Sequence, residues 1–112
     1  MRLTLTSAMA ALLLFVADSG LAAGDAENGQ GLYAICAACH GQNAEGMVAM
    51  NSPALAGMEE WYVIRQLQNF KSGIRGSNPE DTYGLQMASM AKMLADEQAI
   101  ADVAAYVYGL AN

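Results

Sequence analysis

Both cysteines and the single histidine of this 112-residue chain lie within one short segment, residues 35–41, which reads ICAACHG. A Cys-x-x-Cys pair can serve as a disulfide switch, as part of a metal site, or as a point of covalent cofactor attachment. Each of these chemistries needs a different fold around the pair. The rest of the sequence therefore has to show which of the three chemistries fits.

The first two chemistries do not fit the remaining sequence. A structural zinc ion takes four ligands, whereas this chain offers only Cys36, Cys39 and His40, two of them adjacent. A thioredoxin-like switch places its pair at a helix start within a β-α-β unit. Here the pair ends a predicted helix, and no strand pattern is visible. A disulfide that closes so short a loop would add little stability.

Covalent haem attachment fits, because Cys-x-x-Cys-His is its signature. We expect Cys36 and Cys39 to bind the two vinyl groups of one haem c, and His40 to face the iron. Residues 41–58 and 75–84 are rich in glycine, asparagine and proline and are expected to be loops. Loops of this length need something to pack against, and a large flat cofactor would serve.

The N-terminus resembles an export signal. Arg2 precedes a short apolar run, and small residues follow Asp18. The expected domains are a signal peptide at residues 1–22, with cleavage one residue later as the alternative, and a haem-binding domain at residues 23–112. The apolar run is too short for a membrane span. The uncleaved membrane anchor remains the other interpretation.

Helical periodicity predicts an all-α domain with three main helices and long loops wrapped around one haem. The helices are expected at residues 25–38, from about Glu59 to a left-handed cap at Gly73, and from an N-cap at Asp96. The apolar positions that show the period are Gly29, Leu32, Tyr33 and Cys36, then Val63, Leu67, Phe70 and Ile74, then Ile100, Val103, Val107 and Leu110.

At this point the chain resembles a known family. Three stretches, AGDAENGQGLYAICAACHGQNAEG, NSPALAGMEEWYVIRQLQNFKSGIRG and MASMAKMLADEQAIADVAAYVYGL, look like the class I cytochromes c. More narrowly, they are similar to small bacterial periplasmic monohaem cytochromes, to one unit of the dihaem periplasmic cytochromes, and to cytochrome c domains fused to oxidase subunits. The resemblance implies a cytochrome c fold and an electron carrier in the periplasm of a Gram-negative bacterium.

The sixth iron ligand is expected to be a methionine, because haem electron carriers often pair His with Met. Six methionines follow the signal, and the cluster at residues 87–93 lies far from His40 along the chain. The resemblance aligns the family's ligand with Met87 and leaves Met90 as the alternative. Met93 is expected in the core, and Met47, Met50 and Met58 are fallbacks.

The resemblance assigns further roles outside the motif. It implies that the backbone carbonyl of Pro53 accepts a hydrogen bond from the haem histidine. It also implies that Gly29 and Tyr33 lie where the first and last helices cross, with Tyr106 beside them. Lys71 and Arg75 could meet the haem carboxylates, although solvated surface charge is the simpler interpretation.

The net charge of −6 limits the partners. Nucleic acid is excluded because its phosphates would repel the chain. We expect a monomer, without a membrane span after signal removal, that exchanges electrons with redox proteins and is not itself an enzyme. The alternatives are a haem enzyme or gas-binding protein with an open sixth iron site, and an electron-transfer subunit of a larger complex.

Overall fold

The computed structural model describes residues 23–110, so the expected signal peptide lies outside the described residues. Within this range the chain forms four α-helices and no β-strand, which confirms the all-α prediction and adds one helix to the three expected. The elements are α1 (Ala26–His40), a short 3₁₀ turn (Val48–Met50), α2 (Glu60–Ser72), α3 (Thr82–Ala91) and α4 (Glu97–Gly109).

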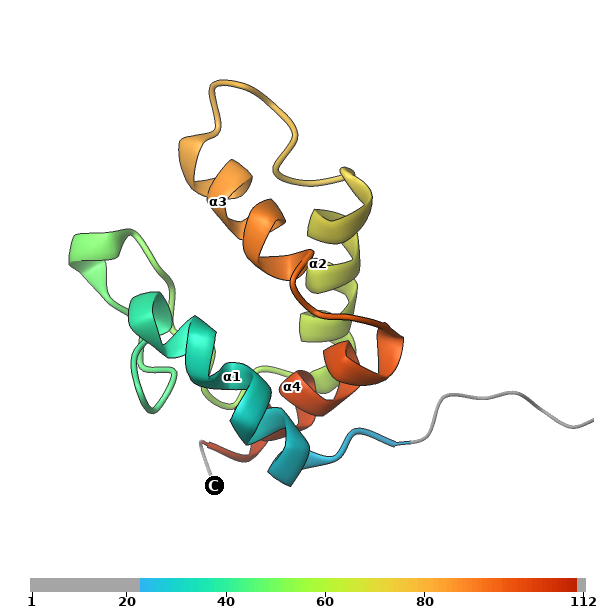
Figure 1. Cartoon of the computed structure of the whole chain (residues 1–112). Coiled ribbons are helices and arrows are strands. Elements are labelled where there is room, and N and C mark those ends of the chain that lie inside the picture. The colour runs from blue at the N-terminus through green and yellow to red at the C-terminus, as the bar shows by residue number, and fades with distance from the viewer. Residues whose placement is uncertain (1–22, 111–112) are drawn as a thin grey trace, which may run out of the picture.

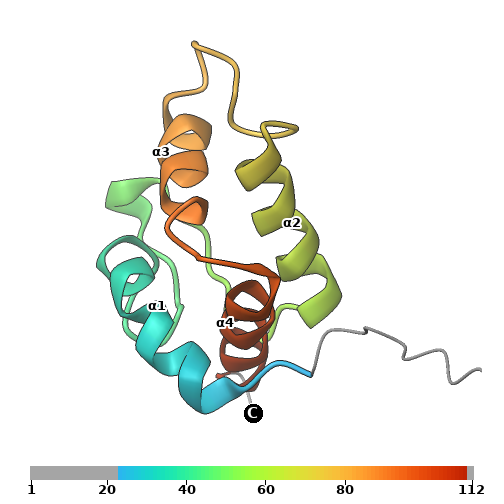
Figure 2. The same ribbon diagram turned by 45° about the vertical axis from the view of Figure 1, so that its right-hand side comes forward.

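Figure 1 shows α1 and α4 packed together at one end of the molecule, with α2 and α3 side by side at the other. The loop between α1 and α2 projects beside the C-terminal end of α1. Figure 2 shows α4 beneath the pair formed by α2 and α3. α4 thus contacts both α1 and α2, and it joins the two halves of the fold.

Aspartate side chains begin three of the helices. Asp25 accepts hydrogen bonds from the backbone N–H groups of Glu27 and Asn28, and so caps α1. Asp81 caps α3 by accepting the N–H of Gly84. Asp96 caps α4, which confirms the predicted N-cap. A capping carboxylate satisfies otherwise unpaired N–H groups and also complements the positive end of the helix dipole.

The crossing of α1 and α4 depends on a residue without a side chain. A β-carbon on Gly29 would lie 1.9 Å from the carbonyl oxygen of Asp102. Tyr33, one turn further along α1, is buried, and its ring centroid lies 5.3 Å from that of Tyr106. The resemblance-based expectation for Gly29, Tyr33 and Tyr106 is therefore confirmed, because Gly29 permits close approach of the two backbones.

Asp102 also fastens the start of α1 to α4. Its carboxylate accepts hydrogen bonds from the backbone N–H of Asp25 at 2.8 Å, from the Asn28 amide at 2.6 Å and from the Gln98 amide at 2.9 Å. These donors, the Asp25 N–H first, lower the pKa of the Asp102 carboxyl below its ordinary value. A carboxylate is therefore retained in the interior because its oxygens are satisfied by donors.

Two apolar clusters fill the interior. The larger lies between α1, α4 and the loop after α1, and its buried members are Tyr33, Ala37, Ala44, Leu94, Ala99, Ile100, Val103 and Val107. The smaller cluster, Phe70, Ala88 and Ala91, joins α2 to α3. The predicted stripe of α4 is confirmed, since Ile100 and Val107 are fully buried.

The predicted end of α2 is confirmed, but the buried apolar stripe of this helix ends at Phe70, one turn before its predicted last member. Gly73 caps the helix with a φ of +81°, in the left-handed region. Ile74 lies beyond this cap and is 77% exposed, so its predicted place in the core is wrong. Among residues 23–110, none of the helices has the length and apolar character needed to cross a bilayer.

Candidate functional site

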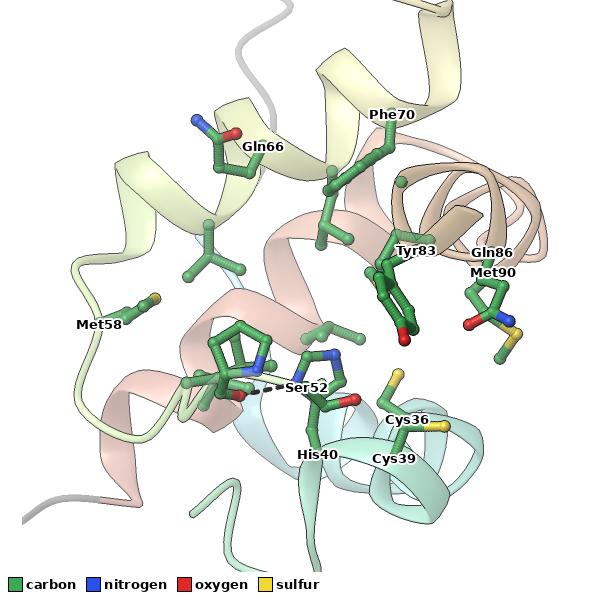
Figure 3. Close-up of a pocket in the computed structure, with 18 of the residues that line it drawn as sticks. Cys36, Cys39, His40, Ser52, Met58, Gln66, Phe70, Tyr83, Gln86 and Met90 are labelled. Atoms are coloured by element: carbon green, nitrogen blue, oxygen red, sulfur yellow. Dashed lines mark hydrogen bonds between the residues drawn. The ribbon is translucent and has the colours of Figure 1, made fainter. Parts of the chain in front are cut away.

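The last turn of α1 brings the motif residues to one pocket. Cys36, Cys39 and His40 all line this cavity of about 400 Å³, which α2, α3, α4 and the loop after α1 enclose together with α1. Both thiols are unbonded and half-buried, and the His40 side chain is buried. Figure 3 shows the two cysteine side chains on the same side of the pocket, next to the imidazole.

The imidazole of His40 is held by the loop that follows α1. Its Nδ1 lies 2.8 Å from the carbonyl oxygen of Pro53, the dashed line in Figure 3. A carbonyl oxygen can only accept, so Nδ1 carries the proton, and in the neutral ring Nε2 keeps the lone pair that a metal needs. The contact expected between His40 and Pro53 is therefore present in the structure.

Backbone hydrogen bonds hold this loop in place. The N–H of Gly46 donates to the carbonyl oxygen of His40 at 2.7 Å, and the N–H of Leu55 donates to that of Ala44 at 2.8 Å. The loop thus folds back on the end of α1. Because Pro53 lies within this structure, its carbonyl oxygen is fixed relative to the imidazole.

Tyr33 supports the same turn from within the core. Its hydroxyl donates a hydrogen bond to the carbonyl oxygen of Gly41 at 2.7 Å, immediately after His40. Burial, with smaller contributions from Cys36 and Glu45, raises the pKa of Tyr33 to about 12. Tyr33 therefore remains a neutral donor. Burial, followed by the neighbouring Cys39, also raises the pKa of the Cys36 thiol.

The structure separates the methionines proposed from sequence into two groups. Met87 and Met90, both half-buried on α3, line the pocket, as does Met58 before α2. Met47 and Met50 lie outside the pocket lining and are exposed. Met93 is 62% exposed, so its predicted place in the core is wrong. Three thioethers of the described chain thus remain available to a group bound in the pocket.

Of the two cations considered, Arg75 lies at the pocket and Lys71 does not. The Lys71 ammonium instead donates to the carbonyl oxygen of Leu94 on another face. The structure also places Gln66, Asp81 and Tyr83 in the pocket lining, which sequence reasoning missed. Tyr83 lies one helical turn before Met87 on α3. This four-residue spacing from the expected ligand was the sequence signal that could have placed Tyr83 at the pocket.

Charge is distributed unevenly around the pocket. From residue 28 to residue 58 the sequence contains one charged side chain, Glu45. That segment supplies Cys36, Cys39 and His40 and also the exposed side chains of Ile35 and Val48. The opposite wall, from α2 to α3, carries Arg75 and Asp81. An apolar segment and a charged segment therefore border the same cavity.

The residues present suit a covalently held haem c. Two thiols at a three-residue spacing, an imidazole oriented through Nδ1, and thioethers from another helix all line one largely apolar cavity. The volume is within the range of small-molecule and cofactor sites. Zinc is a poorer fit, since residues 23–110 contain no cluster of three or more Cys, His, Asp or Glu side chains that could hold a metal ion.

Comparison with known proteins agrees with this geometry. Residues 26–111 match the family model for cytochrome c. Cytochrome c4 of Azotobacter vinelandii is 42% identical over 106 residues, which are 91% of this chain and 50% of that protein. Cytochrome c-554(548) of Halomonas halodenitrificans is 36% identical over 85 residues, covering 75% of this chain and 94% of that protein.

A solved structure gives the same result for the fold. The crystal structure of reduced recombinant cytochrome c4 from Pseudomonas stutzeri has a TM-score of 0.61 and 41% sequence identity, covering 77% of this chain and 45% of the other. The chain spans about half the length of the cytochrome c4 relatives it matches. Its cofactor is one covalently bound haem c, and the chain belongs to the cytochrome c family.

Proposed function

We propose that this protein is a one-electron carrier in which Cys36 and Cys39 hold the haem and His40 and Met87 bind its iron. The observation that carries the proposal is the 2.8 Å contact between His40 Nδ1 and the Pro53 carbonyl oxygen. This contact leaves Nε2 for the metal, in the pocket that both thiols and Met87 line. A bound haem would supply the reversible one-electron couple of its iron.

The chain's own residues would set the properties of that couple. Pro53 orients the imidazole and raises its basicity as a ligand. A methionine on the other side favours the reduced state. Buried apolar side chains, such as Val63, Phe70 and Val107, line the pocket and would limit the access of water. A fixed ligand set and a dry site both keep the reorganisation that accompanies electron transfer small.

We also propose that the protein is not an enzyme by itself. Peroxide chemistry at an open iron site would need a distal base, and the sequence has no second histidine. Asp81, a carboxylate in the pocket lining, accepts a hydrogen bond from the backbone N–H of Gly84 at 2.8 Å. Its capping role accounts for its position without catalysis.

The proposed setting is the periplasm. Residues 1–22 would be removed as a signal peptide, and residues 23–112 would form the cytochrome c domain as a monomer. Thiols that are consumed by cofactor attachment can no longer form the disulfide that oxidising conditions outside the cytoplasm favour. The net charge of −6 favours donors and acceptors that carry basic docking surfaces.

Replacement of Met87 tests the proposed ligand set. Met87→Ala in the haem-loaded protein is expected to remove the weak red absorption band of methionine-ligated ferric haem and to lower the reduction potential. Met93→Ala is the matched control, because Met93 is exposed and lies outside the pocket lining. A Met87→Ala protein with an unchanged spectrum and potential would overturn the assignment. If Met90→Ala lost the band instead, Met90 would be the ligand.

A further inference from the structure

Trp61, in the first turn of α2, is an exposed tryptophan that its neighbours hold in place. Its side chain is 60% exposed, and that of Tyr62 is 40% exposed. The two rings meet edge to face with centroids 5.8 Å apart, and the guanidinium carbon of Arg65 lies 5.6 Å from the Trp61 centroid. Tryptophan, tyrosine and arginine are the side chains enriched at the energetic centres of protein interfaces. A ring that is already held loses little freedom when a partner covers it.

The same turn of α2 borders the haem pocket. Tyr62 and Val63 line the pocket, as does Met58 just before the helix. In Figure 3, Met58 lies on the opposite side of the pocket from Cys36 and Cys39. A surface at the start of α2 is therefore separate from the edge of the cofactor that the two thiols would hold.

Backbone hydrogen bonds fix this turn relative to the rest of the fold. The N–H of Gly57 donates to the carbonyl oxygen of Val107 on α4 at 3.0 Å, and the N–H of Met58 donates to that of Leu55 at 3.0 Å. Val63, on the inner side of the turn, is buried. The exposed rings are thus presented on a rigid base beside the pocket.

Two adjacent carboxylates accompany the rings. Glu59 is exposed and Glu60 is half-buried, and within residues 23–110 no cation pairs with either. Residues 28–58, which supply the motif side of the pocket, contain Glu45 as their single carboxylate. The start of α2 therefore offers a basic protein more groups to pair with than the motif side does, although Arg65 offsets one of the two charges.

We propose that the surface formed by Glu59, Glu60, Trp61 and Tyr62, named here the aromatic turn, docks a basic redox protein, with Trp61 as the anchor. The inference rests on the electron-carrier function proposed above. Cations of the partner pair with the two carboxylates, and an apolar patch of the partner covers the indole ring. The net charge of −6 attracts such a partner, and the aromatic turn determines where it binds. Because the pocket begins directly behind Tyr62, a partner bound there lies close to the cofactor.

The experiment measures binding of a defined basic probe, zinc-substituted mitochondrial cytochrome c, which exchanges no electrons in the dark. The haem-loaded, reduced protein is titrated with this probe, and its amide resonances are followed by NMR. Residues 59–65 are expected to show the largest shifts. Trp61→Ala should raise the dissociation constant about tenfold, whereas Trp61→Phe, which keeps an aromatic ring, should raise it less.

Two control variants isolate the aromatic turn. Ile74→Ala also truncates an exposed apolar side chain, which is 77% exposed, but this residue lies beyond the other end of α2 and outside the pocket lining. Its dissociation constant should equal that of wild type. Glu59→Gln and Glu45→Gln each remove one negative charge, and Glu59→Gln should weaken binding about threefold at low salt, more than Glu45→Gln does.

A light flash applied to mixtures of the probe with the oxidised protein tests whether this docking is productive. The excited zinc porphyrin passes one electron to the ferric haem, and no bond is formed or broken. Below saturation, the bimolecular rate should fall in Trp61→Ala by about the same factor as the affinity. A lower affinity with an unchanged rate would show that electrons cross elsewhere and would overturn the inference.

The outcomes distinguish this inference from the proposed function. Shifts that are largest in residues 28–58, or a Trp61→Ala protein that binds the probe as tightly as wild type, would overturn the docking surface and leave the electron-carrier assignment intact. A wild-type protein that does not bind the probe would do the same. Failure of the wild-type chain to bind haem covalently would contradict both proposals.

Discussion

Gly29 of α1 and Asp102 of α4 lie so close that a β-carbon on the glycine would stand 1.9 Å from the aspartate carbonyl oxygen. The Asp102 carboxylate meanwhile accepts the backbone N–H of Asp25 and the side-chain amide of Asn28. One residue of α4 therefore contacts the first turn of α1 through its backbone and through its side chain. The relative position of these helices depends on both contacts.

A methyl group at Gly29 is expected to destabilise this crossing. Gly29→Ala should lower the free energy of unfolding by about 2 kcal/mol or more, because neither backbone can move aside without loss of packing. Gly31→Ala is the matched control. Gly31 has open space around the corresponding position, so alanine should stabilise α1 by about 0.5–1 kcal/mol. Chemical denaturation measures both, and a Gly29→Ala protein as stable as wild type would contradict the close contact.

Asp102 should make stability depend on acidity. Its pKa is lowered in the folded protein, so its contribution is complete above about pH 4, where the unfolded carboxyl is also ionised, and is lost as the pH falls through the lowered value. Asp102→Asn replaces one accepting carboxylate oxygen with an NH₂ group, which would face the N–H donors of Asp25, Asn28 and Gln98. Its melting temperature should fall below that of wild type at pH 7, and the gap should narrow in acid. A gap that is constant from pH 7 to pH 3 would argue against an ionised Asp102.

The Tyr33 hydroxyl is expected to stabilise the turn that carries the haem histidine. Tyr33→Phe would remove one of the two donors to the buried carbonyl oxygen of Gly41, which keeps the N–H of Ala44 at 3.1 Å, so the expected cost is that of one hydrogen bond, about 0.5–1.5 kcal/mol. Tyr106→Phe is the control, because the Tyr106 hydroxyl makes no hydrogen bond within residues 23–110 while its ring packs on Tyr33. Denaturant unfolding of both haem-loaded variants should show a larger loss for Tyr33→Phe. Equal losses would assign the effect to ring packing.

The rate of electron exchange with a basic redox protein should fall as the salt concentration rises. The net charge of −6 steers a positively charged partner, and dissolved ions screen that attraction. Stopped-flow measurements should show the bimolecular rate falling by about tenfold between about 0.01 M and 0.15 M salt. A small uncharged mediator should show no such change. A rate with the basic protein that is independent of salt would contradict electrostatic steering.

The sequence predicted the elements whose apolar side chains recur at helical spacing. The stripe of α4 and the left-handed cap at Gly73 were both correct, because each depends on local chemistry. The motif residues Cys36, Cys39 and His40 were also brought together as expected, since positions i, i+3 and i+4 lie on one face of a helix.

α3 was not predicted, because its buried face is made of small residues rather than large apolar ones. Its buried residues are Gly84, Ala88 and Ala91, of which the two alanines pack with Phe70, and they give no strong periodic signal. Its N-cap, Asp81, was the local signal that could have located it. For Arg75 the sequence left two interpretations open, a contact with the haem carboxylates and solvated surface charge. Its position depends on a turn that α3 confines, and this is a tertiary contact.

The contacts between α1 and α4 also constrain the order of events during synthesis. Asp25 and Asp102 are 77 positions apart, and Asn28 lies 74 positions from the same carboxylate. Contacts of such separation form late, because a long stretch of chain must first be closed into a loop. The helix that carries both thiols therefore has no α4 to pack against until almost the whole chain has been made. Packing of the helix that carries Cys36 and Cys39 is thus completed only once the C-terminal helix is in place.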